Sequence, residues 1–308
     1  MSRPTLAVID LKALRANFAL AQSLTPGAST IPMVKANAYG HGMIEVSRAL
    51  SESAPAFGVA SIDEALVLRE AGIKQPILLL EGTFSCDEVG VAADNNFILM
   101  VENSAQKDAI LNASISRPVS VWLGIDTGMH RLGFEPHEAT QAYLALSNTD
   151  NVAKPIVAAS HFACADDLGS SATERQVVIF DQCTASMADA TNDVIAKSLG
   201  NSAAILAWPK THRDWQRPGY MLYGNSPFSE GQENANKLQP VMSLQSAVIS
   251  IRRIASGESV GYTANWTADR NSIIATITVG YGDGYPRQAP NGTPVLVNGV
   301  RCPLVGRV

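Results

Sequence analysis

The stretch AFGVASIDEALVLREAGIKQPILLLEG, residues 56–82, contains the pattern that predicts the fold. AFGVAS and QPILLLEG are short apolar runs typical of buried strands, and IDEALVLREAGI between them has the length and mixed polarity of a surface helix. Apolar strands that alternate with helices indicate parallel strands whose sheet is covered on both faces. This segment therefore predicts one strand–helix–strand unit of an α/β fold.

The same alternation extends from about residue 30 to residue 225. Further strands are expected in TIPMVKA, NFILMVEN, VSVWLGIDT and PIVAASHFA, with helices over residues 42–53 and 172–190. The seven or eight units, of which the last two are faint, favour a (β/α)8 barrel over a doubly wound open sheet. Ahead of them, residues 6–24 are expected to form a short strand and then a helix, with Asp10 as its N-cap.

The pattern changes after residue 240. The remaining apolar segments alternate loosely at period two, and Asn-Gly turns occur at residues 291–292 and 298–299. A mostly-β domain is therefore expected, which gives a barrel over residues 1–235 and a β domain over residues 236–308. The sequence stops at Val308 within strand-like residues, so the β domain is expected to be truncated there.

Composition excludes several classes of function. The net charge is −5 and the pI is about 5.6, so a broad basic face for nucleic acid is not expected. No signal peptide and no run of about 18 apolar residues is present, which argues against a membrane protein. The four scattered cysteines fit a reducing compartment and lack zinc spacing, so a cytoplasmic protein without a metal is expected.

Polar residues stand where expected strands end, which in a barrel is the face of the active site. They are Lys35, Asp126, Arg131 and His161. Lys35 follows the apolar run IPMV, and burial would lower the pKa of its amine and enable it to form a Schiff base. The turns NSAAI at residues 201–205 and RPGYMLYG at residues 217–224 have the small residues and free amides that suit a phosphate group.

Seven motifs together resemble the alanine racemases, a barrel-plus-β-domain family that uses pyridoxal 5′-phosphate. They are VKANAYGHG (34–42), DTGMHRLGF (126–134), SHFACADD (160–167), NSAAIL (201–206), RPGYMLYG (217–224), VGYTANW (260–266) and VGYGDGYPR (279–287). VKANAYGHG is the most specific of the set, and the resemblance extends from residue 3 to the end.

The resemblance implies a cofactor site. Lys35 matches the lysine that holds the cofactor aldehyde as an aldimine, and Arg217 matches the arginine that faces the pyridine nitrogen. Because arginine stays protonated, it cannot give that nitrogen a proton, and the weaker electron sink favours racemisation over transamination. The residues implied at the phosphate are Tyr39 and Ser202 through their hydroxyls, Gly219 and Tyr220 through backbone N–H, and Asn201 close by.

The resemblance also implies a two-base reaction. Lys35 would act on the proton of the D-enantiomer, and Tyr262 on that of the L-enantiomer. A hydrogen-bond chain from His161 to Arg217 would help the tyrosine to act as a base. In the family, each site takes this tyrosine from the other subunit, so a homodimer with composite sites is implied.

Arg131 matches the arginine that holds the substrate carboxylate, and Tyr281 a tyrosine that narrows the entrance. The sequence departs from the family at Gly124, where many members have a carbamylated lysine that hydrogen-bonds the arginine. A bound chloride or a water is expected to take that place beside Arg131. A Met-Asp motif and a further phosphate tyrosine would lie beyond Val308.

The function implied is an alanine racemase that supplies D-alanine for peptidoglycan, with a broad-specificity amino-acid racemase as the alternative. A barrel-type decarboxylase of basic amino acids is disfavoured because Cys302 lacks that family's context. A cofactor-binding protein without activity is disfavoured because such proteins lack a β domain. Inhibition by D-cycloserine would distinguish the racemase from both.

Overall fold

Residues 9–241 form a closed barrel of eight parallel strands, here called the barrel unit. The computed structural model describes residues 3–308. The strands follow the order β2-β9-β8-β7-β6-β5-β4-β3. A bridge between Met33, just after β2, and Gly58 in β3 closes the ring. The strands are β2 (Ser29–Thr30), β3 (Phe57–Val59), β4 (Ile77–Leu79), β5 (Phe97–Val101), β6 (Val119–Gly124), β7 (Val152–Ala159), β8 (Ala196–Ser198) and β9 (Trp215–Gln216).

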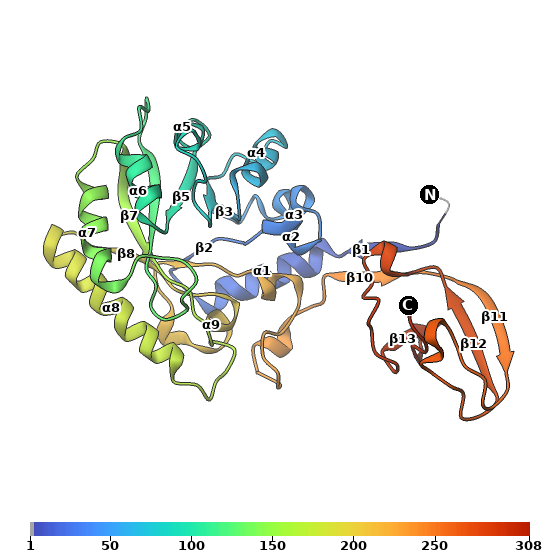
Figure 1. The fold of residues 1–308 in the computed structure, drawn as a ribbon. Coiled ribbons are helices and arrows are strands. Elements are labelled where there is room, and N and C mark those ends of the chain that lie inside the picture. Colours follow the sequence, from blue (N-terminus) through green and yellow to red (C-terminus); the bar gives the residue numbers. More distant parts are fainter. Residues whose placement is uncertain (1–2) are drawn as a thin grey trace. The chain divides into compact units, whose positions relative to one another are not determined.

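Helices lie around the outside of these strands, as Figure 1 shows. Asp10 caps the first of them by accepting hydrogen bonds from the backbone N–H groups of Lys12 and Ala13, as predicted. The helices are α1 (Leu11–Leu24), α2 (Lys35–Tyr39), α3 (Met43–Leu50), α4 (Ile62–Glu70), α5 (Asp87–Asp94), α6 (Ser104–Leu111), α7 (Pro136–Ser147), α8 (Ala172–Thr191) and α9 (Ser202–Ala207), with short 3₁₀ turns η1 (Pro209–Thr211), η2 (Tyr220–Tyr223) and η3 (Ala235–Lys237).

Two apolar layers explain why the strands are continuously hydrophobic. In β4, Leu78 packs in a cluster inside the barrel with Met33 and Trp122. Its neighbours Ile77 and Leu79 belong to a larger cluster that includes the helices. Because successive side chains of a strand point to opposite faces, a strand with two buried faces needs apolar residues at every position. The predicted barrel is thus confirmed, and the open sheet is not what forms.

The remaining described residues, 3–8 and 242–308, form a separate β unit. Here β1 (Leu6–Ile9) pairs with β10 (Met242–Gln245), and β11 (Val248–Ile254) pairs antiparallel with β12 (Ser272–Ile277). The pair β13 (Pro294–Val297) and β14 (Val300–Pro303) is joined by the predicted Asn-Gly turn, whose Asn298 and Gly299 have φ of 48° and 82°. Two 3₁₀ turns, η4 (Tyr262–Ala264) and η5 (Tyr281–Asp283), complete the unit.

The observed division differs from the expected boundary at residues 235 and 236. Asn17 in α1 explains part of the difference, because its buried side chain binds the segment after η3. Its amide donates to Leu222 O at 3.0 Å and to Gln239 O at 2.8 Å, and its oxygen accepts from Gln239 N–H at 2.9 Å. Residues 236–241 therefore belong to the barrel unit, and residues 3–8 to the β unit.

Candidate active site

A cavity of about 1090 Å³ opens in the barrel unit where the strands end. Glu102 follows β5, Gly124 ends β6 and Ser160 follows β7, so at least three neighbouring strands contribute to its wall. All nine site residues that were predicted within the barrel unit line this cavity: Lys35, Tyr39, Arg131, His161, Asn201, Ser202, Arg217, Gly219 and Tyr220. The strand-end rule selected three of them, Lys35, Arg131 and His161, and the turn composition and the family resemblance selected the other six.

Lys35 precedes a turn of left-handed backbone. Ala36, Asn37, Ala38 and Tyr39 have φ between 52° and 54°, although the hydrogen bonds of α2 resemble those of a helix. Left-handed backbone is unfavourable for residues with a Cβ, so contacts from elsewhere must hold it. Glu64 of α4 provides one, since its carboxylate accepts the Ala36 N–H at 2.6 Å.

The charge state of Lys35 is altered in the direction expected from the sequence. Burial, followed by the positive charge of Arg131, lowers the pKa of its amine, and Glu81 and Glu64 oppose the shift. A lysine with a lowered pKa is more often neutral at physiological pH, which is the form that attacks a carbonyl and accepts a proton.

Tyr39 lies between a second tyrosine and a glycine. Its ring stacks on Tyr223 with 4.8 Å between centroids, and the Tyr223 hydroxyl donates to Met33 O at 2.9 Å. A Cβ on Gly219 would lie 2.5 Å from the Tyr39 hydroxyl oxygen and 3.2 Å from its ring. Only glycine therefore allows the hydroxyl to approach this turn so closely. Tyr223, which was not predicted from the sequence, packs against the ring of Tyr39 and holds it in place.

The turn after β9 is organised by Ser202. Its hydroxyl accepts the N–H groups of Gly219 at 3.0 Å and of Met221 at 3.2 Å. Asn201 caps α9 by accepting the Ala204 N–H at 3.0 Å. The Gly219 N–H that was predicted to face a phosphate is thus directed at the Ser202 hydroxyl, and both groups lie on one wall of the cavity.

Arg217 is 4% exposed, and the predicted hydrogen-bond chain from His161 does not reach it. Its two terminal nitrogens donate instead to the Ser198 hydroxyl and, at 2.5 Å, to Ser160 O. Burial lowers the pKa of Arg217 to about 10, and Glu102 opposes that shift. Burial, and then the charge of Arg217, lowers the pKa of His161 to about 3, so this imidazole is neutral and cannot supply positive charge.

Arg131 lies on a loop that returns to β6. The Asp126 Oδ1 atom accepts the N–H groups of Gly128 at 2.9 Å, Met129 at 3.1 Å and His130 at 3.0 Å. Phe134 N–H donates to Gly124 O at 2.9 Å, which closes the loop. Burial opposes ionisation of Asp126, but these hydrogen bonds and His130 outweigh it and lower its pKa. The loop backbone is therefore fixed, while the Arg131 side chain remains exposed.

Glu102 is a cavity residue that was not predicted from the sequence. It directly follows β5, and its carboxylate lies where a side chain on Gly124 would begin. The missed signal was available, because Glu102 is a charged residue after an apolar strand, as Lys35 is. The space in which a chloride or water was expected thus adjoins a carboxylate of the chain itself.

The two remaining predicted residues belong to the β unit. Tyr262 begins η4 and is 74% exposed, and Tyr281 begins η5 and is 63% exposed. Neither lines the cavity of the barrel unit. Their predicted roles depend on a second chain and stay predictions.

Two family models match the chain. The one described as "Alanine racemase, N-terminal domain" matches residues 9–227, and the one described as "Alanine racemase, C-terminal domain" matches residues 241–308. An alanine racemase of Pseudomonas taetrolens is 47% identical over 306 residues, which are 99% of this chain and 84% of the relative. A biosynthetic alanine racemase of Escherichia coli is 46% identical over 303 residues, covering 98% and 82%.

Solved structures agree with these matches. The biosynthetic alanine racemase of Pseudomonas aeruginosa superposes with a TM-score of 0.92 at 44% identity, covering 99% of this chain and 84% of that one. The alanine racemase of Bacillus anthracis with bound L-Ala-P superposes with a TM-score of 0.85 at 31% identity, covering 100% and 80%. Both domains are thus matched by sequence and by structure.

Proposed function

The chain belongs to the alanine racemase family, and from this membership we propose that it interconverts L- and D-alanine with pyridoxal 5′-phosphate by a two-base mechanism. The observation that supports the proposal best is Lys35, whose pKa is lowered in a cavity with eight other residues of the family's motifs. The enzyme would supply D-alanine for peptidoglycan in the cytoplasm. The four free cysteines of the described chain are consistent with that compartment.

The residues present fit this cofactor. Gly219 leaves room beside the Tyr39 hydroxyl, and the Ser202 hydroxyl, which accepts the Gly219 N–H, lies next to the same turn, so two hydroxyl donors for a phosphate lie together. Arg217 is buried and protonated, as suits a group that faces a pyridine nitrogen. When bound, pyridoxal phosphate supplies an aldehyde for Lys35 and a ring that withdraws electrons from the substrate's α-carbon.

Lys35 acts as the base on one face of the α-carbon. Burial and Arg131 favour its neutral amine, which removes the α-proton of D-alanine and returns a proton when the product is D-alanine. Arg131 binds the substrate carboxylate, because its planar guanidinium pairs with both carboxylate oxygens. The hydrogen bonds that Asp126 accepts from Gly128 and His130 fix the backbone from which Arg131 extends.

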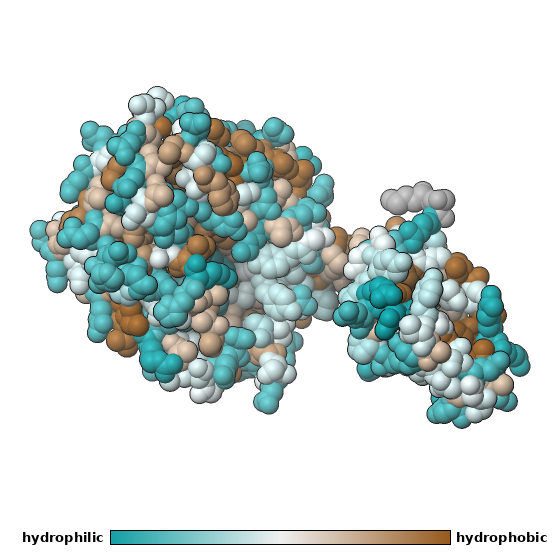
Figure 2. Space-filling model, viewed as in Figure 1, coloured by the Kyte–Doolittle hydropathy of each residue, from teal (hydrophilic) through white to brown (hydrophobic). Residues whose placement is uncertain are grey.

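Tyr262 of a second chain acts on the opposite face, with Tyr281 narrowing the entrance. Two acid–base groups are needed because inversion removes a proton from one face and adds one to the other. Both tyrosines are exposed in the β unit, together with Ile249, Ile251 and Ile273. Figure 2 shows brown, hydrophobic surface on this unit. Such exposure is consistent with burial against a second copy.

Borohydride trapping tests the proposal. Purified protein with pyridoxal phosphate should absorb near 420 nm, lose this band on reduction, and yield one modified peptide containing Lys35. Lys35→Ala should abolish the adduct and the racemisation of L-alanine, whereas Lys12→Ala, at an exposed position of α1, should change neither. An adduct at another lysine, or none, would contradict the proposal. Assays over a panel of amino acids would separate alanine racemase from a broad-specificity enzyme.

A further inference from the structure

Glu102 is a charged residue of the cavity for which the proposed mechanism has no role. Its backbone is held firmly, since its N–H donates to Gln106 Oε1 at 2.8 Å. Gln106 in turn donates to Glu81 O at 2.7 Å and to Thr83 O at 3.2 Å. Glu102 is therefore fixed by α6 and by the loop after β4, and its carboxylate lines the cavity together with Arg131 and Arg217.

The position of this carboxylate explains Gly124. Strands β5 and β6 are neighbours, with Val101 paired to Leu123, so Glu102 and Gly124 follow side by side. A Cβ on Gly124 would overlap Glu102 Oε2 and would lie 2.6 Å from Glu102 Cδ. Gly124 does not have the positive φ that favours glycine, so its backbone gives no reason for the choice. The absence of a side chain makes room for the carboxylate.

Burial and the two nearby arginines shift the pKa of Glu102 in opposite directions. Burial raises the pKa of this carboxyl to about 7, while Arg217 and then Arg131 oppose the rise and Asp126 adds to it. Conversely, Glu102 is the group that opposes the lowering of the Arg217 pKa. Within residues 3–308, no ion pair shorter than 4.0 Å joins Glu102 to either arginine. The interaction therefore acts through the field across the cavity.

We propose that Glu102 is a positioning residue, whose carboxylate occupies the space left by Gly124 and attracts the exposed Arg131 side chain toward the orientation that binds the substrate carboxylate. This inference rests on the proposed function and assigns a second group to the same site. Above its pKa of about 7, where the carboxyl is ionised, Glu102 also disfavours a small anion beside Arg131. Glu102, and not chloride, is then the counter-charge of this arginine.

Kinetics of Glu102→Gln measured above pH 7, where the wild-type carboxyl is ionised, test the proposal, because the amide keeps the shape and removes the charge. The KM for L-alanine should rise about tenfold while kcat changes less than about threefold, since a lost positioning charge weakens substrate binding. Glu70→Gln, at an exposed position of α4, is the matched control and should leave both values unchanged. A KM within twofold of the wild-type value would overturn the inference and leave the racemase proposal standing. A wild-type protein without racemase activity would overturn both.

A double-mutant cycle tests the link to Gly124. Gly124→Ala should fold, because the overlapped atoms are the far end of a flexible side chain, but should displace the carboxylate and raise the KM as Glu102→Ala does. In the Glu102→Ala background the same change should have little further effect. Gly90→Ala in α5, where a Cβ meets nothing within 4 Å, is the control. Additive effects of the two substitutions would overturn the proposed link.

Crystals grown in bromide give a readout that does not depend on activity. In crystals grown above pH 7, the wild-type protein should show no anomalous peak beside Arg131, since the ionised Glu102 occupies the neighbouring space and repels anions. A bromide peak at this position would mean that a halide is the counter-charge, and would overturn the inference.

Discussion

His161 is neutral in the folded protein, and this has a measurable effect on stability. Burial lowers its pKa to about 3, whereas an unfolded histidine titrates near 6.5. Between these values the unfolded chain binds more protons, so the stability contributed by neutral His161 is present above about pH 6.5 and is lost as the pH falls toward 3. His161→Gln should therefore reduce acid destabilisation by a few kcal/mol, at about 1.4 kcal/mol per pKa unit.

Glu102 determines the direction in which the stability of His161→Gln changes with pH. Its pKa is raised to about 7, so its contribution to stability is present below about pH 4.5 and is lost as the pH rises through 7. In His161→Gln the free energy of unfolding, measured with urea, should consequently fall between about pH 4.5 and 7. His137→Gln, at an exposed position of α7, serves as the control. If the free energy of unfolding of His161→Gln decreased at acidic pH as much as that of the wild-type protein, His161 would not be neutral when folded.

The sequence predicted which residues line the site better than it predicted the bonds that they form. Lys35, His161 and Arg217 were found because charged or polar residues beside apolar strands and the family motifs mark them. The bonds of Arg217 were predicted wrongly, because the distances of Ser198 and Ser160 from its guanidinium depend on how three strands align. The position of Glu102 after an apolar strand was visible in the sequence, but its role depends on the space at Gly124, which only the neighbouring strand reveals.

At the scale of elements, the left-handed turn after Lys35 is strained and can be relieved. Ala36 is exposed with a φ of 52°, where glycine has no steric penalty. Ala36→Gly should raise the free energy of unfolding by about 0.5–1 kcal/mol, because the relief of about 1–2 kcal/mol of left-handed strain exceeds the added entropy of the unfolded chain. Urea denaturation would measure it.

The matched control is Ala185→Gly in α8. Ala185 is exposed in a long right-handed helix, so glycine there should cost about 1 kcal/mol. The two substitutions should thus have opposite signs. If Ala36→Gly also destabilised the protein, the turn would not be strained. The hydrogen bond to Glu64 would then not be needed to hold the left-handed backbone in place.

The sequence predicted most elements but not this turn. Apolar spacing located α1, α3, α4 and α8, and Asp10 and Asn298–Gly299 marked a cap and a hairpin through their local chemistry. The strand expected over residues 30–36 stays regular only to Thr30, partly because Pro32 has no N–H to donate. The left-handed turn has no local signal, since Glu64, which holds it, lies in another helix.

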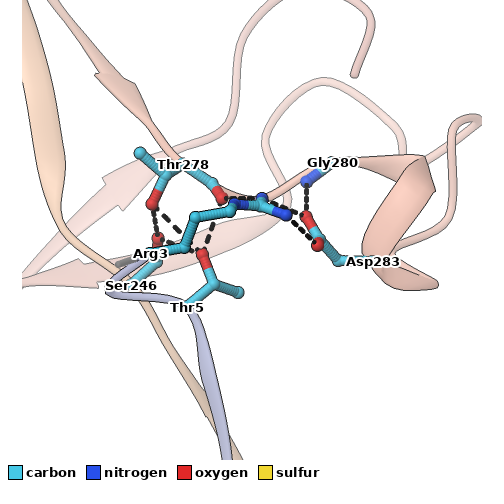
Figure 3. Close-up of polar contacts among 6 residues, drawn as sticks. All are labelled: Arg3, Thr5, Ser246, Thr278, Gly280 and Asp283. Carbon is cyan, nitrogen blue, oxygen red and sulfur yellow. Dashed lines mark hydrogen bonds and ion pairs between the residues drawn. The ribbon is translucent and has the colours of Figure 1, made fainter. Parts of the chain in front are cut away.

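In the β unit, Arg3 holds the turn that contains Tyr281. Figure 3 shows its guanidinium paired with both Asp283 carboxylate oxygens, at 2.8 Å each, while Nη2 also donates to Thr278 O at 2.8 Å. Asp283 also accepts the Gly280 N–H at 3.1 Å. Arg3→Ala should therefore speed hydrogen exchange of residues 278–284, because the carboxylate that caps η5 loses its partner.

Exchange measured against pH adds a second criterion. The hydrogen bond from Arg3 holds the pKa of Asp283 below its ordinary value, so protection of the turn should be lost as the pH falls through that lowered pKa. In Arg3→Ala the loss should begin at a higher pH. Arg270→Ala, at an exposed site beside Asp269, is the control. Identical hydrogen exchange of residues 278–284 in wild type and Arg3→Ala would show that the Arg3–Asp283 ion pair does not hold the turn that contains Tyr281.

At the scale of the whole molecule, the chain consists of two units that each hold one of the two proposed bases. Lys35 lies in the barrel unit and Tyr262 in the β unit. Composition and periodicity predicted both units, but whether the bases of one site come from one chain or from two is a property of the assembly. Sequence patterns within a single chain contain no geometric information on that point, and only the family resemblance implied two chains.

Mixing inactive variants decides between these two arrangements. Lys35→Ala and Tyr262→Phe should each be inactive alone. If every site uses both chains of a homodimer, a mixed dimer has one site with both defects and one site with neither. Random exchange makes about half of the dimers mixed, so about a quarter of the wild-type activity should return. Sites built within one chain would regain none.

The reciprocal mixture tests the same geometry in the opposite direction. When wild type is exchanged with an equal amount of the double variant Lys35→Ala/Tyr262→Phe, every site of a mixed dimer has one defect. Only pure wild-type dimers stay active, so activity should fall to about a quarter of that of an all-wild-type sample of the same total concentration. Sites within one chain would retain about half. A recovery near a quarter in the first mixture and a fall to a quarter in the second require that Tyr262 reaches the Lys35 of its partner.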